Sequence, residues 1–135
     1  MKIMIDTNIV LDLLLNRSPF VDDAVKLFEQ AEKKRIVAYI TANSVTDLVY
    51  ILRKAYSLTE IKEHLRKMFT FISIAAITPG DIGDALDLNA PDFEDALLMQ
   101  CARRYEVDII VTRNIKDFKS SPVKCIDIKE WAKQF

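Results

Sequence analysis

The sequence is poor in glycine and histidine, and each shortage excludes a class of site. Only two glycines, Gly80 and Gly83, occur among 135 residues. Neither a GxxxxGK(S/T) phosphate loop nor a GxGxxG dinucleotide-binding turn is therefore present. The single histidine, His64, excludes a histidine-rich metal site and disfavours a Ser-His-Asp triad. Because charged residues surround it in the sequence, we expect His64 on the surface. If this protein acts on phosphate groups, it must use another kind of site.

Cysteine and long apolar runs are also scarce. Cys101 and Cys125 form no CxxC motif and have apolar sequence neighbours, so we expect buried free thiols in a reducing compartment. The longest apolar run, residues 69–77, is far too short to cross a bilayer. Asp6 interrupts the only apolar stretch near the start, so no secretory signal is predicted. We expect a soluble cytoplasmic protein with no membrane association.

The residues that are present predict one globular domain spanning residues 1–135. Half of the chain is hydrophobic, 29% is charged and the net charge is −1, which gives no global basic field for nucleic acid. Charge is nevertheless uneven, because the segment 81–95 contains six acidic residues and no lysine or arginine. Such a segment is usually a solvated face, but it can also bind a cation.

Strand and helix patterns alternate along the chain, which predicts a parallel sheet with helices on both sides. Ser18 and Pro19 have the character of an N-cap and first residue of a helix. The run 108–112 is rich in β-branched residues and is expected to be buried on both faces. The predicted strands are 2–5, 36–40, 71–77, 108–112 and 123–126, and the predicted helices are 7–15, 18–35, 43–55, 57–69, 79–88, 92–105 and 128–135.

Acidic and amide side chains follow two of these strands. Asp6 ends the first strand, and Asn114 and Asp117 lie just beyond the strand 108–112. In an open parallel sheet, ligands bind at the carboxyl ends of the strands. Two helices contribute further acids near their starts, which are Asp47, Asp92 and Asp95.

Each acid alone has an ordinary explanation. Asp6 is placed to cap the following helix, and Asp92 with Asp95 has the spacing of a capping arrangement. Asp47 alone is compatible with an exposed helix position, and Asp117 with a turn cap. Together, carboxylates within ~5 Å would repel by roughly 3 kcal/mol per pair at an effective dielectric of about 20. A divalent cation relieves this repulsion, and oxygen ligands without histidine or cysteine favour Mg²⁺ or Mn²⁺.

These motifs, in this order, resemble the PIN domain, and in particular the small stand-alone VapC-type toxins. The resemblance covers nearly the whole chain. It rests on Asp6-Thr7-Asn8, Ser44…Asp47, the segment Asp92–Leu97 and Thr112-Arg113-Asn114…Asp117-Phe118. It implies an α/β fold, a Rossmann-like α/β/α sandwich with a mostly parallel central sheet. It also implies a Mg²⁺- or Mn²⁺-dependent ribonuclease that cuts single-stranded RNA, frequent homodimers and often a cognate antitoxin protein.

The resemblance assigns roles to individual residues. The metal-binding and catalytic acids are Asp6, Asp47, Asp95 and Asp117, with Asp92, Asn114, Thr7 and Asn8 as auxiliary residues. Asp47 stands where most relatives have glutamate, and Asn114 stands where the last acid usually follows Thr-Arg, so that Asp117 is the nearest replacement. Both departures bear on a second metal site more than on the first. Arg113 and Lys116, with Arg17 as a weaker candidate, could bind the phosphate backbone or be solvated loop charges.

Two other functions compete with the nuclease. A catalytically weak or inactive PIN-like binding or scaffold module is favoured by Asn114 and by the short side chain of Asp47. An aspartyl-phosphate phosphohydrolase would use Asp6 as nucleophile, but Asn8 stands where that chemistry needs a second aspartate. Among the aromatic residues, Trp131 and Phe135 are expected to anchor the core. Tyr50, Leu52 and Tyr56 fit either an interface or burial within the monomer.

Overall fold

The computed structural model covers residues 1–135 and contains a five-stranded sheet in which every strand is parallel to its neighbours. The strand order is β3-β2-β1-β4-β5, so the chain builds outward from β1 on one side and then crosses to the other. The expected α/β sandwich is thus confirmed. The strands are β1 (Lys2–Ile5), β2 (Val37–Thr41), β3 (Ile72–Ala75), β4 (Ile109–Thr112) and β5 (Cys125–Asp127).

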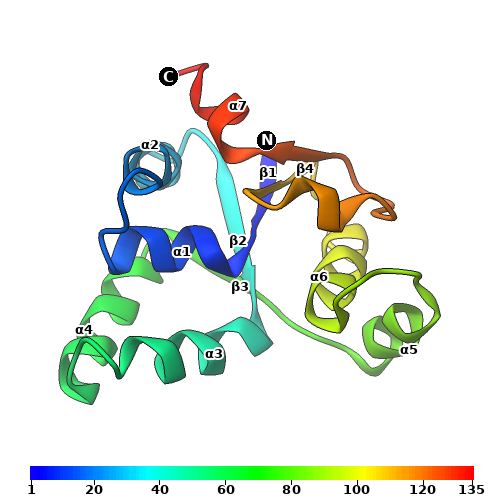
Figure 1. Ribbon diagram of the computed structural model, residues 1–135, viewed down its shortest axis with the longest axis horizontal. Helices are drawn as coiled ribbons and strands as arrows, with labels where there is room; N and C mark the ends of the chain where they lie inside the picture. The colour runs from blue at the N-terminus through cyan, green and yellow to red at the C-terminus, as the bar shows by residue number, and fades with distance from the viewer.

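Helices cover both faces of this sheet (Figure 1), with α1 to α4 on one side and α5 and α6 on the other. They are α1 (Thr7–Leu14), α2 (Val21–Glu32), α3 (Ala42–Leu52), α4 (Leu58–Met68), α5 (Pro79–Asp87), α6 (Phe93–Arg104) and α7 (Ile128–Ala132), and a short 3-10 helix, η1, spans Ile115–Phe118. No helix combines the length and the hydropathy that a membrane span needs.

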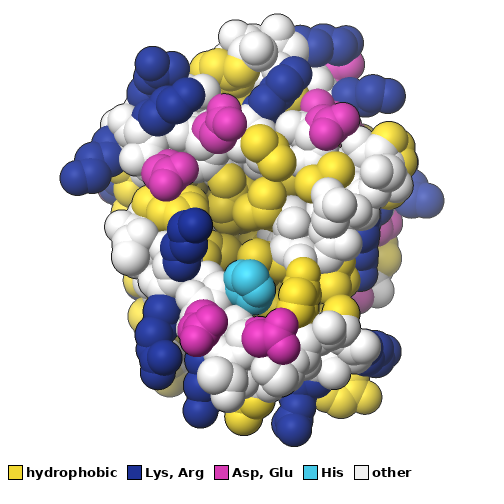
Figure 2. Space-filling model, turned by 90° about the vertical axis from the view of Figure 1, so that its left-hand side faces the viewer, with side chains coloured by type: hydrophobic (Ala, Val, Ile, Leu, Met, Phe, Trp, Pro, Cys, Tyr) yellow, Lys and Arg dark blue, Asp and Glu magenta, His cyan; other side chains and the backbone are white.

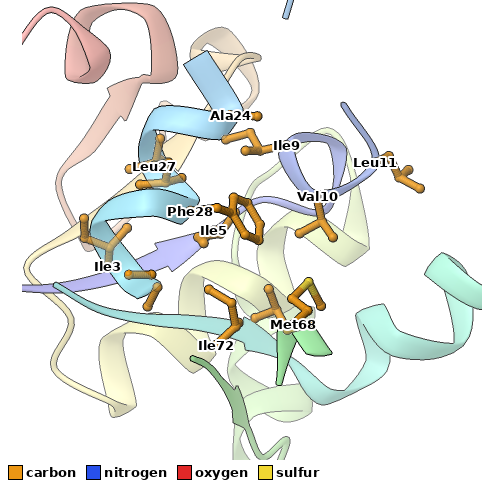
Figure 3. Packing of buried hydrophobic residues seen from close by; sticks show 14 of the residues in the cluster. Ile3, Ile5, Ile9, Val10, Leu11, Ala24, Leu27, Phe28, Met68 and Ile72 are labelled. Atoms are coloured by element: carbon orange, nitrogen blue, oxygen red, sulfur yellow. The ribbon is translucent and has the colours of Figure 1, made fainter. Parts of the chain in front are cut away.

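Two hydrophobic clusters lie on opposite faces of the sheet because side chains alternate along a strand. Ile3 and Ile5 belong to the larger cluster, whereas Met4 between them belongs to the smaller one. Figure 3 shows the larger cluster, where Phe28 of α2 and Val10 of α1 lie near Ile5. All four residues of β4 are buried, as expected for a strand covered on both faces.

Several sequence predictions need correction. Helix α2 begins at Val21 rather than at Ser18-Pro19, because those two residues form a turn and Phe20 takes the N-cap position without a side-chain bond. The helix η1 was not predicted, since four residues are too few for a periodic pattern. Phe135 is 52% exposed and is not a core anchor, whereas Trp131 is buried as expected.

The expectations for the surface histidine and the thiols are largely confirmed. His64 is exposed. Both cysteines are free; Cys101 is buried, but Cys125 is only half-buried.

An ion pair fixes α6 against α5. The Arg104 guanidinium at the end of α6 donates to both carboxylate oxygens of buried Asp81, with Nε at 2.9 and 3.1 Å. Burial alone would raise the pKa of Asp81, but hydrogen bonds from Arg104 and the Thr78 backbone hold it below its ordinary value. Arg104 also donates to the Ala76 carbonyl. The contact sets the position of α6, whose N-terminus carries Asp92 and Asp95.

Candidate metal centre

An open cavity of about 390 Å³ lies at the carboxyl ends of the central strands. Asp6 follows β1, Thr41 ends β2 and Asn114 follows β4. The cavity therefore lies at the ends of β1 and β4, between which the order of the strands changes direction. Six acidic side chains line the cavity, and none of its lining residues is lysine or arginine. The six are Asp6, Asp47, Asp92, Glu94, Asp95 and Asp117.

Asp6 is the most deeply buried of these acids, with 6% of its surface exposed. It occupies the N-cap position of α1, yet its side chain makes no capping hydrogen bond. Its carboxylate instead accepts a hydrogen bond from the Thr112 hydroxyl at 2.8 Å, and that hydroxyl accepts one from the Asn114 backbone at 3.0 Å. Burial raises the pKa of Asp6, although the bonds from Thr112 and the Thr7 backbone oppose the shift. The carboxylate of Asp6 therefore does not serve as a side-chain cap of α1.

Helix α6 brings Asp92 and Asp95 to the same cavity. Asp92 caps the helix, because its carboxylate accepts a hydrogen bond from the Asp95 backbone at 3.1 Å. The ordinary capping role of Asp92 is thus confirmed, and it lines the cavity as well. Burial, followed by the charges of Asp6, Asp92 and Asp117, raises the pKa of Asp95 to about 7. The charge of Asp6 thus acts on Asp95, which lies 89 positions later in the sequence and lines the same cavity.

Helix α3 forms the opposite wall. Asp47 lines the cavity from its middle, and burial together with the charge of Asp47 raises the pKa of Glu94 on α6. Near the start of α3, the Ser44 hydroxyl lies 3.1 Å from the Thr7 hydroxyl and 2.6 Å from that of Thr41. These three hydroxyls join the ends of β1 and β2 beneath the acids.

The structure pairs two predicted phosphate-binding residues with Asp12, an acid outside the cavity. The Arg113 guanidinium binds buried Asp12 of α1 in a bidentate pair, with distances of 2.7 and 3.0 Å, and also packs over the ring of Phe20. Arg17 lies 3.6 Å from the same carboxylate. Neither arginine lines the cavity. Lys116 is exposed on η1 and lines a neighbouring hollow that shares Asp117 with the cavity.

The remaining predicted residues converge, and others join them. Thr7, Asn8 and Asn114 line the cavity with the acids. Glu94 and Asn43 also line the cavity, although neither was predicted as a site residue. The acidic segment 81–95 was the available signal for Glu94, whereas no sequence signal marked Asn43, whose Oδ1 is buried without a hydrogen-bond partner.

The donor set suits a hard divalent cation. Carboxylate, amide and hydroxyl oxygens line the cavity, and neither histidine nor cysteine is among them. As the side chains lie, no three of the acids form a group able to ligate one ion. Mg²⁺ retains several waters and commonly takes only one or two protein carboxylates directly, which agrees with such spacing.

Comparison with known proteins agrees with the fold and the motifs. The PIN domain family profile matches residues 2–116. No curated protein sequence matches the chain. Similar solved structures include VapBC2 from Rickettsia felis bound to a DNA fragment from its promoter, with a TM-score of 0.73, 20% identity and coverage of 94% of this chain and 98% of that chain.

Two further structures extend the comparison. A toxin-antitoxin complex from Klebsiella pneumoniae has a TM-score of 0.68 and 19% identity, covering 93% of this chain and 96% of that one. VapC20 from Mycobacterium tuberculosis, a toxin that cleaves the sarcin-ricin loop, has a TM-score of 0.64 and 14% identity, covering 80% and 86%. At these identities the likeness concerns the fold.

Proposed function

This chain belongs to the PIN domain family, and we propose that it is a Mg²⁺- or Mn²⁺-dependent endoribonuclease that hydrolyses phosphodiester bonds in single-stranded RNA. The observation that carries the proposal is a cavity lined by six acids and no basic side chain. A fold retains such repulsion where a cation offsets it. The cleavage of the sarcin-ricin loop by VapC20, which has a similar fold, supports the same reaction class.

Four acids would hold the cation. Asp6 and Asp95 come from different walls and influence each other electrostatically, so they form the centre of the site. Asp47 and Asp117 complete it, and Asn114 contributes an uncharged oxygen. Once bound, a divalent cation activates water and stabilises the departing oxygen of the phosphodiester.

Neighbouring residues set the orientation and the protonation of these carboxylates. The Thr112 hydroxyl donates to one oxygen of Asp6 at 2.8 Å and so restrains the orientation of that carboxylate. With a pKa of about 7, Asp95 is only partly ionised at neutral pH, and any proton that it holds must leave before the carboxylate can bind a cation. Lys116, exposed beside Asp117, is placed to bind a substrate phosphate.

A cleavage assay tests the proposal. The chain should cut a labelled single-stranded RNA in Mg²⁺ or Mn²⁺ and be inactive in EDTA. Asp6→Asn and Asp95→Asn should each abolish cleavage. Asp87→Asn, an exposed acid at the end of α5 outside the cavity, is the matched control and should cleave normally. Equal cleavage by Asp95→Asn and the control would refute the assignment.

We further propose that this nuclease is the toxin of a toxin-antitoxin pair and forms a homodimer. Similar folds occur in the Klebsiella toxin-antitoxin complex and in VapBC2. Figure 2 shows hydrophobic side chains gathered on the face that carries the end of α1, with charged residues around them. Half-buried Leu13, Leu14 and Leu15 lie in that part of the chain. Co-expression with the neighbouring reading frame should yield a complex in which cleavage is inhibited.

A non-catalytic module is the second candidate. The observation that favours it is that the acids do not form a ligating group as they lie, together with Asn114 in place of a charged ligand. A Mn²⁺ titration separates the two functions. A nuclease gains thermal stability from the ion, whereas a module with a vestigial site shows no shift even in millimolar metal.

A further inference from the structure

Helix α3 presents one row of functional side chains that runs out of the cavity. Asn43, Asp47 and Tyr50 line the cavity, and Lys54 follows just past the end of the helix. Spacings of four and three residues place Asn43, Asp47 and Tyr50 on the same face of α3, and Lys54 follows four residues later, beyond the helix end. At 1.5 Å per residue, Tyr50 stands about 4.5 Å along the axis from Asp47, and the Lys54 ammonium lies 5.9 Å from the Tyr50 ring centroid. The row therefore connects the acidic centre to the surface beyond it.

Tyr50 differs from the other tyrosines of the chain. It is 73% exposed, although its side chain forms part of the cavity wall. The rings of Tyr39 and Tyr105 pack on each other, and the Tyr56 hydroxyl donates to the Leu14 carbonyl at 2.6 Å. The Tyr50 hydroxyl has no such bond. The Lys54 ammonium lies 5.9 Å from the centroid of the Tyr50 ring, which is the outer limit of a cation–π interaction.

The negative charge of the cavity is the reason why a nucleic-acid substrate would need a contact that does not involve its phosphates, such as stacking on the Tyr50 ring. Six acids repel the phosphates of a nucleic acid as it approaches, and the cavity wall holds no lysine or arginine to offset the repulsion. Stacking of a base on an aromatic ring does not depend on the charge of the phosphates and contributes substantially to the binding of single strands. An exposed ring beside one cation supplies both kinds of contact at the cavity mouth.

We propose that Tyr50 and Lys54 form a nucleotide-binding subsite for a single-stranded substrate, with a base stacked on the ring and a phosphate paired with the ammonium. This inference rests on the proposed nuclease function. A base held on Tyr50 keeps one neighbouring phosphate above the acids and the next above Lys54. Because every base has a flat face, the subsite selects unstacked strands over duplexes rather than one base over another.

Binding of a fluorescein-labelled hexanucleotide RNA, followed by anisotropy, tests the subsite. The measurement uses an Asp95→Asn background in Mg²⁺ so that the probe stays intact. Tyr50→Ala should weaken binding about tenfold, Tyr50→Phe should retain it, and Tyr50→Leu should not restore it, because only a ring can stack. Lys54→Ala should reduce the slope of log affinity against log salt by roughly 0.7, the value for one phosphate contact on a single strand.

Phe135→Ala is the matched control, since Phe135 is an exposed aromatic residue outside the cavity. Its affinity should equal that of the background. Unchanged binding in Tyr50→Ala overturns the subsite but leaves the nuclease intact. If the unmodified chain binds the RNA tightly but does not cleave it, the nuclease proposal is overturned. The Tyr50 and Lys54 variants then decide the subsite by their binding alone. Tyr50→Ala could instead sediment as a monomer where the unmodified chain sediments as a dimer, and Tyr50→Phe could also lose binding. These two results together would show that Tyr50 contacts a second copy of the chain, and they would overturn the subsite.

Discussion

Arg113 Nε lies 2.7 Å from a carboxylate oxygen of Asp12, whose side chain is 2% exposed. The pair joins the loop after β4 to α1, the helix that Asp6 precedes. Arg113 adjoins Asn114, a cavity residue, in the sequence. The pair therefore sets the distance between two walls of the site without contacting what binds there.

Replacing this arginine should destabilise the fold. Arg113→Ala leaves a buried carboxylate with only Arg17, at 3.6 Å, to offset its charge. Breaking a buried pair in this way costs about 3 kcal/mol of unfolding free energy. Urea denaturation measures the loss. Lys116→Ala, three residues along and exposed, is the control and should change stability by less than about 0.5 kcal/mol. Similar losses in both variants would show that the pair has no special role.

Divalent metal should stabilise the folded protein. At a hundredfold excess over the dissociation constant, one bound ion adds about 2.7 kcal/mol. For a chain of this size the melting temperature should then rise by roughly 5–10 °C. Differential scanning fluorimetry with Mn²⁺ measures the shift. Asp6→Asn should abolish it, whereas Asp87→Asn should preserve it. A shift that survives in Asp6→Asn would mean that the ion binds elsewhere.

The metal-free protein should become more stable as pH falls from 8 toward 5. The pKa of Asp95 is about 7 in the folded chain, whereas the ordinary pKa of an unperturbed aspartate is 3.8. A raised folded pKa means that the native state binds the proton more tightly, so its stabilising effect is complete below pH 3.8 and is lost as pH rises through 7. Urea midpoints in EDTA across this range test the sign. In Asp95→Asn the dependence should flatten, and a midpoint that rises with pH would contradict the assignment.

Thr112 should control the ionisation of Asp6. Its hydroxyl hydrogen bond lowers the pKa of that carboxyl against the effect of burial. Thr112→Val removes the bond, so the pH profile of cleavage should move to higher pH. A hydrogen bond to a charged group contributes about 1.5–3 kcal/mol, and metal affinity should fall accordingly. Thr112→Ser should restore both properties. If valine leaves the pH profile unchanged, the hydroxyl serves packing alone.

The fold was largely predictable because each buried strand is a short apolar run in the sequence, whatever contacts it makes in the folded chain. The residues that end β1 and β4 were predictable for the same reason, since they follow those runs directly. The helix start at Ser18-Pro19 failed because a favourable cap sequence also suits a turn. The partner of Arg113 lies 101 positions away, so nothing near Arg113 indicated that a buried carboxylate would bind it.

Exposure was the harder property to predict. Tyr50 stands among apolar residues that are half-buried or buried, and the sequence analysis left it open between an interface and the monomer core. The helix places Leu48 and Leu52 inside and turns Tyr50 outward. Spacing alone could not separate Glu94 from an ordinary first-turn acid, because its raised pKa comes from burial in the fold and then from the charge of Asp47 on another helix.

The six acids lie on four segments, since Asp92, Glu94 and Asp95 share the start of α6, whereas the hydroxyls near them belong to the strand ends and the first turns of α1 and α3. Asp92 caps α6, but exchanging an acid that makes no such bond to the backbone, such as Asp47, for a shorter or neutral side chain leaves the backbone framework undisturbed. In the course of evolution, a molecule of this design is free to drift in metal preference and reaction rate by single substitutions. The fold is then inherited unchanged, while metal binding and catalysis are gained or lost through the substitution of single acidic side chains.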